Sequence, residues 1–78
     1  MTYQQKFEEL RKEFAEASDK YIKADKALSE ANGFADTYLI DNFANTKKAF
    51  EITGNNYHQF ILSANKNKVR SEDEFGQQ

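Results

Sequence analysis

The chain has 78 residues, a formal net charge of −2, one histidine and no cysteine. A chain this short forms one domain at most, and without cysteine it has neither a disulfide framework nor the thiolate ligands of a structural zinc site. The small negative charge disfavours a protein that coats nucleic acid with a basic surface.

The first half of the chain predicts one long helix over residues 2–31. Its apolar residues recur in alternating steps of four and three, which is the heptad pattern of a coiled coil. Thr2 and Gln5 match a capping box at its start. Asn32 and Gly33 predict its end, because glycine adopts the left-handed conformation of a C-cap without steric cost. The stripe consists of Tyr3, Phe7, Leu10, Phe14, Ala17, Tyr21, Ala24, Leu28 and Ala31.

A second helix is predicted over residues 34–66, after a turn at 32–34. Asp36 falls in its first turn, where the helix dipole stabilises an acidic side chain. The same spacing of apolar residues continues past Gly54, but glycine is a poor helix former, so a kink at that position is left open. This second stripe consists of Leu39, Phe43, Thr46, Phe50, Thr53, Tyr57, Phe60 and Ala64.

The two stripes predict an antiparallel hairpin when the chain is folded back at the turn. Facing residues then have numbers that add to the same constant, and in most layers an aromatic ring faces Ala or Thr. Such matching of large to small side chains fills the space between two helices without voids. The layers are Leu28 with Leu39, Ala24 with Phe43, Tyr21 with Thr46, Ala17 with Phe50, Phe14 with Thr53, Leu10 with Tyr57, Phe7 with Phe60, and Tyr3 with Ala64.

The resulting interpretation is an all-α protein, a two-helix antiparallel coiled-coil hairpin over residues 1–68 with a flexible polar tail over 69–78. Polar residues dominate this tail, and only Val69 and Phe75 in it are apolar. A single hairpin of this size buries little apolar area. We therefore expect it to dimerise into a four-helix bundle.

Apolar residues of the second helix that lie off the seam predict a protein-binding face. Isolated surface isoleucines and tyrosines are ordinary, so this interpretation depends on their clustering rather than on their number. We expect a noncatalytic interaction module, such as a small regulator, adaptor or inhibitor, whose partner is a second copy of the chain or another protein. The predicted anchors are Tyr38, Ile40, Ile52, Ile61 and Leu62.

A row of lysines on the first helix supports an alternative function, an RNA- or nucleic-acid-binding hairpin dimer. Lys20, Lys23 and Lys26 lie along one side of that helix, and paired helices present such rows to an RNA groove. Asp19 and Asp25 are interleaved with them, which is typical of a solvated face. Nucleic acid is therefore the less favoured partner.

The sequence predicts no catalytic residue, cofactor or metal site. A two-helix hairpin offers no pocket that would hold reacting groups, and the phosphate-binding, dinucleotide-binding and metalloprotease motifs are missing from the sequence. His58 follows a seam residue and is expected at the surface. The first residues lack the basic and apolar segments of a secretion signal, and we expect no membrane span and a cytoplasmic location.

Overall fold

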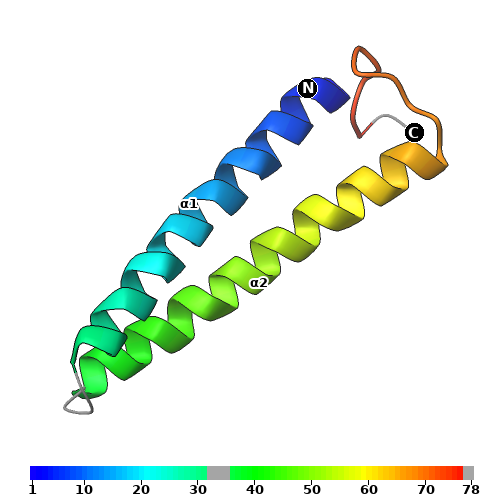
Figure 1. Ribbon diagram of the computed structural model, residues 1–78. Coiled ribbons are helices and arrows are strands. Elements are labelled where there is room, and N and C mark those ends of the chain that lie inside the picture. Colours follow the sequence, from blue (N-terminus) through cyan, green and yellow to red (C-terminus); the bar gives the residue numbers. More distant parts are fainter. Residues whose placement is uncertain (32–35, 77–78) are drawn as a thin grey trace.

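The computed structural model describes residues 1–31 and 36–76, which form two antiparallel helices packed side by side (Figure 1). Helix α1 spans Tyr3–Glu30 and helix α2 spans Thr37–Lys66. The molecule is a rod with extents of 52 × 17 × 16 Å. The predicted all-α fold of two packed helices is confirmed. The predicted turn at 32–34 lies outside the described residues.

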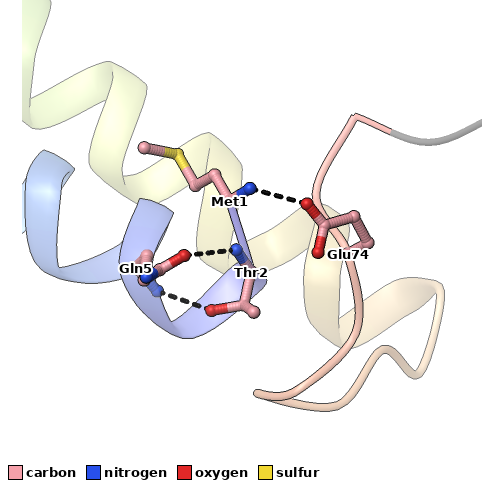
Figure 2. Close-up of polar contacts among 4 residues, drawn as sticks. All are labelled: Met1, Thr2, Gln5 and Glu74. Carbon is pink, nitrogen blue, oxygen red and sulfur yellow. Dashed lines mark hydrogen bonds and ion pairs between the residues drawn. The ribbon is translucent and has the colours of Figure 1, made fainter.

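The start of α1 has the capping box that the sequence predicts. Thr2 is the N-cap, and its Oγ1 accepts a hydrogen bond of 3.2 Å from the backbone N–H of Gln5. The Gln5 side chain returns the interaction, since its Oε1 accepts from the N–H of Thr2 at 2.8 Å (Figure 2). Two N–H groups that a helix cannot satisfy internally are paired in this way.

The start of α2 differs from the prediction in the place of Asp36. This residue is the N-cap, not a first-turn residue, and its Oδ1 accepts from the N–H of Leu39 at 2.9 Å. The position is favourable because a short carboxylate reaches the free N–H groups of the first turn only from the residue before the helix.

Helix α2 ends in a Schellman motif. The N–H of Val69 donates to the carbonyl of Ala64 at 3.1 Å, and the N–H of Lys68 donates to Asn65 at 3.2 Å. Lys68 has a φ of 54°, in the left-handed region where glycine is the usual residue. This conformation turns the chain away from the helix axis.

The seam between the helices is a ladder of aromatic rings. The ring of Tyr21 lies between those of Phe43 and Phe50, with centroid distances of 5.6 and 5.0 Å. The predicted register places Thr46 opposite Tyr21, and the two contacted rings lie one turn before and one turn after that threonine. At this level the rings contact each other diagonally across the predicted layer, because side chains lean along the helix rather than straight across. The predicted pairing of Phe7 with Phe60 is replaced by ring contacts of Phe7 with Tyr57 and of Phe60 with Tyr3.

Gly54 lies inside α2, which continues through it as one helix. A Cβ placed on Gly54 would lie 3.0 Å from a ring carbon of Phe14. That ring is stacked between Phe50 and Tyr57, with centroid distances of 5.3 and 5.8 Å. Gly54 therefore makes room for the Phe14 ring in the seam.

Within residues 1–31 and 36–76, the buried core is small and comes from α1 alone. Leu10, Ala17 and Ala24 are 3% to 8% exposed, and no residue of α2 is buried to this extent. The two alanines are the small seam residues that the sequence places opposite rings of α2. The rings themselves stay half-buried, because one neighbouring helix covers a ring on one side only.

Residues 69–76, called the strap below, return from the end of α2 to the start of α1 (Figure 1). The first-turn N–H groups of Tyr3 and Gln4 donate to the carbonyls of Asp73 and Ser71 at 2.8 and 3.0 Å. The flexibility predicted for the tail stays a prediction. The structure adds a defined path for it, which depends on contacts between the two ends of the chain.

Candidate functional site

The five predicted anchors of α2 are all exposed at the surface. Their exposed fractions range from 37% at Ile61 to 72% at Tyr38. Leu62, Ile52 and Ile40 lie between these limits, at 49%, 50% and 52%. These five residues are called the outer face of α2 below, and their role in binding stays a prediction.

The outer face follows two lines along α2. Tyr38 and Ile52 are two heptads apart and share one side, while Ile40 and Ile61 are three heptads apart and share the other flank. Leu62 lies between the two lines. Since a helix rises about 1.5 Å per residue, the set extends for about 36 Å from Tyr38 to Leu62. The surface therefore has the length of a partner helix rather than the shape of a small-molecule pocket.

The end of the hairpin where the termini meet has an open groove of about 460 Å³. Tyr3 and Phe7 of α1 and Phe60 and Ile61 of α2 supply apolar lining, and Val69 of the strap lines the groove as well. Ile61 therefore belongs both to the outer face and to this groove. Sequence reasoning missed the groove because part of its lining comes from the strap, where Val69 is an isolated apolar residue in a polar tail.

The strap is anchored at Glu74 and Phe75. Thr2 and Glu74 form an isolated antiparallel bridge, and the amino group of Met1 pairs with Oε1 of Glu74 at 2.6 Å (Figure 2). The ring of Phe75 packs edge-on against Tyr3, with centroids 5.2 Å apart. A polar segment thereby carries one apolar side chain to the end of the aromatic seam.

The three lysines of the alternative function are only partly brought together. Lys20 and Lys23 border a shallow hollow of about 240 Å³ that Asn42 and Thr46 of α2 also line. Lys26 points to another partner, because its Nζ lies 4.0 Å from a carboxylate oxygen of Glu30.

Groups suited to acid–base or metal chemistry are dispersed along the rod. His58 is exposed. In residues 1–31 and 36–76, no three His, Cys, Asp or Glu side chains come close enough to share a metal ion. Across the same residues, neither helix contains an apolar stretch of the length that crosses a bilayer.

Comparison of the chain with protein-family models, with curated proteins and with solved structures gave no match. The function proposed below is therefore argued from the surfaces of this chain alone.

Proposed function

We propose that this chain is a noncatalytic protein-binding module, a small regulator, adaptor or inhibitor that acts through the outer face of α2. Its first partner is a second copy of the chain, with which it forms a four-helix bundle, and its place of action is the cytoplasm.

The observation that carries the proposal is that α2 leaves large apolar side chains exposed and buries none of its residues. Helix α2 presents five large apolar side chains that are 37% to 72% exposed, and none of its residues is buried. Exposed apolar side chains gathered on one element are typical of an interaction surface. Taking a fully exposed side chain of this kind to full burial contributes about 1.5 to 3 kcal/mol, and each of these five, already partly covered, would contribute a part of that.

The small core supports self-association as the first form of binding. Only Leu10, Ala17 and Ala24 are well buried among the residues described, and the aromatic seam stays half-exposed along its edges. A second hairpin would cover one of those edges, since bundles of four helices enclose a core that two helices leave open. A second copy of the chain carries the same half-exposed seam edge, so the two copies can cover each other.

The test is a pair of charge substitutions on the outer face, Ile52→Asp and Leu62→Asp. Both residues are half-exposed, so we expect the double variant to keep its helicity by circular dichroism and to lose self-association by light scattering. Ile22→Asp is the matched control, because Ile22 is the large apolar residue that α1 exposes, at 61%. An unchanged mass for the double variant would contradict the proposal.

Nucleic-acid binding is the second candidate, and the hollow beside Lys20 and Lys23 is the observation that favours it. Asn42 and Thr46 add hydrogen-bonding groups to this basic edge. The variant with Lys20, Lys23 and Lys26 all changed to Ala would then lose RNA binding without a change in mass. Binding by the unmodified chain would also weaken steeply with added salt, because counterions are released from the phosphates. Salt-independent binding would rule this function out.

A further inference from the structure

The strap completes the hydrogen bonding at the start of α1. A helix cannot pair the N–H groups of its own first turn, and the capping box pairs only the N–H groups of its own two residues. Two further groups remain, those of Tyr3 and Gln4. The N–H of Tyr3 donates to the carbonyl of Asp73 at 2.8 Å, and the N–H of Gln4 donates to that of Ser71 at 3.0 Å. The strap therefore supplies two acceptors that α1 lacks.

Charge also favours this position of the strap. The N-terminus of a helix is the positive end of its dipole, and the first turn of α1 has no acidic side chain. The strap contains the acidic run of residues 72–74, and the bridge between Thr2 and Glu74 places this run beside the start of α1. An acidic segment is thereby held at the end of the helix that favours negative charge.

Phe75 is the side chain that fastens the strap. Its ring centroid lies 5.2 Å from that of Tyr3 and 5.7 Å from that of Phe60, and Nζ of Lys6 lies 5.5 Å from it. Residues 70–74 are exposed, so they add backbone bonds but little buried surface. The attachment to α1 therefore depends on one ring and a few backbone bonds.

The part of the strap that can detach begins after Val69. The Schellman motif bonds the N–H of Val69 to Ala64 of α2, so this residue belongs to the end of the helix. The next residues form a turn of their own, in which the N–H of Asp73 donates to the carbonyl of Arg70 at 3.1 Å and the N–H of Arg70 donates to Oδ2 of Asp73 at 2.8 Å. These bonds are internal to the helix end or to the turn, so detachment from α1 breaks none of them.

We infer that residues 70–76, called the latch below, close and open on the start of α1 as one unit while the hairpin stays folded. Segments with few buried contacts open separately from the core of a fold. In the closed state the latch pairs the N–H groups of Tyr3 and Gln4, and in the open state water does so. Opening also removes Arg70 and Ser71 from the lining of the open groove at this end of the hairpin, so the groove is complete only in the closed state. The inference goes beyond the proposed function and makes no use of self-association.

Amide hydrogen exchange of the unmodified chain, followed by NMR, tests the separate opening. We expect the N–H groups of Tyr3 and Gln4 to exchange at least about tenfold more slowly than in an unstructured peptide, because each is hydrogen-bonded to the latch. They should still exchange faster than those of Ala17 and Ala24 in the seam. Urea below the unfolding transition should speed the exchange of the two alanines far more, because opening of the latch exposes little surface.

Two results of this experiment would overturn the latch. Exchange of Tyr3 and Gln4 at the rate of an unstructured peptide would mean that the latch is not closed. Exchange with the same rate and the same urea dependence as the two alanines would mean that it opens only when the whole hairpin unfolds.

Phe75→Ala should shift the latch toward its open state. The variant loses the ring contacts with Tyr3 and Phe60, and we expect the protection of the N–H groups of Tyr3 and Gln4 to fall at least about fivefold. Ser71→Ala is the matched control, since this exposed residue bonds to α1 through its carbonyl, which the substitution keeps. Equal protection in the two variants would contradict the latch, as would a loss of helicity beyond the first turn of α1 in Phe75→Ala, measured by circular dichroism.

A disulfide between positions 2 and 74 locks the latch instead of opening it. Hydrogen bonds of the neighbouring residues flank the bridge between Thr2 and Glu74, which makes it a non-hydrogen-bonded pair with Cα atoms close enough for a disulfide. The chain has no cysteine of its own. The full chain with Thr2→Cys and Glu74→Cys is oxidised at low concentration, and mass spectrometry checks that the bridge lies within one chain.

Hydrogen exchange of this protein is compared between its oxidised and reduced states. We expect the protection of the N–H groups of Tyr3 and Gln4 to be at least about tenfold greater in the oxidised state, because the closed latch can no longer leave. Both states carry the same substitutions, so the reduced sample controls for the lost cap and the lost ion pair. Equal protection in the two states would show that the latch does not open separately, and would overturn the inference.

Discussion

Helices α1 and α2 share a seam pattern and a similar length, yet their exposed surfaces differ in character. The exposed surface of α1 is mainly charged, and that of α2 is more apolar. Of the 28 residues of α1, 13 are charged, whereas α2 has 5 among 30. Within the helices, α1 exposes one large apolar residue, Ile22, and α2 exposes five. The shared pattern builds the hairpin, and the difference between the outer surfaces indicates which helix meets a partner.

The two helices also contribute unequally to the buried part of the seam. In the described part of the chain, the well-buried residues all come from α1, and two of them are alanines. Helix α2 contributes aromatic rings to the same seam, and these rings stay half-exposed. The hairpin is therefore stabilised by rings that overlap one another along the seam, and substitutions in the two helices should differ sharply in their effects.

The largest effect is expected from Phe14→Ala. The Phe14 ring is stacked between Phe50 and Tyr57 and contacts Gly54, so its removal opens a cavity in the ladder. We expect the free energy of unfolding to fall by about 3 kcal/mol in urea titrations. The control Ile22→Ala removes an exposed side chain of the same helix and should change it by less than about 0.5 kcal/mol. Similar losses in both variants would contradict the ladder.

Ala24→Leu tests the unequal burial of alanine in the two helices. Ala24 is 3% exposed, and the larger side chain should push the helices apart and lower the free energy of unfolding by about 2 kcal/mol. Ala44→Leu in α2 is the matched control, since Ala44 is exposed and alanine and leucine are both good helix formers. Thermal or urea unfolding would show the difference, and a neutral Ala24→Leu would mean that the seam has free space.

Gly54→Ala tests whether glycine is required beneath the Phe14 ring. A new Cβ would meet that ring at 3.0 Å, so overpacking of about 1 to 3 kcal/mol should exceed the gain of about 1 kcal/mol in helix propensity. We expect a net loss of about 1 kcal/mol in urea titrations.

The same change in a Phe14→Leu background should stabilise the protein relative to Phe14→Leu alone, because the crowding is gone. A double-mutant cycle measures this reversal. Equal effects of Gly54→Ala in both backgrounds would show that the ring is not the reason for the glycine.

The smallest effect is expected from Lys26→Ala on the charged surface of α1. Lys26 and Glu30 are 4.0 Å apart, and their side chains are 75% and 66% exposed. Exposed pairs of this kind contribute less than about 0.5 kcal/mol, so the urea midpoint should hardly move. A loss above about 1 kcal/mol would mean that the charged surface stabilises the fold after all.

The sequence by itself determined the two helices, their antiparallel pairing and the residues of the seam. Alternating steps of four and three place Tyr21 and Phe43 on facing stripes. Thr2 and Gln5 mark the start of α1 through a local capping pattern. These features are readable because each depends on residues that are close in the chain or repeat with the period of a helix. The exposure of the five residues of the outer face is readable in the same way, because they are the large apolar residues left off the stripe of α2, and their role in binding stays a prediction.

The tertiary structure alone decided how rings meet across the seam, why residue 54 is glycine and where the strap lies. The contact between Phe14 and Gly54 depends on how far a ring leans along its helix, which spacing does not encode. The packing of Phe75 against Tyr3 joins opposite ends of the chain. No local pattern marks such a contact, because its stabilisation exists only once the two helices have brought those ends together.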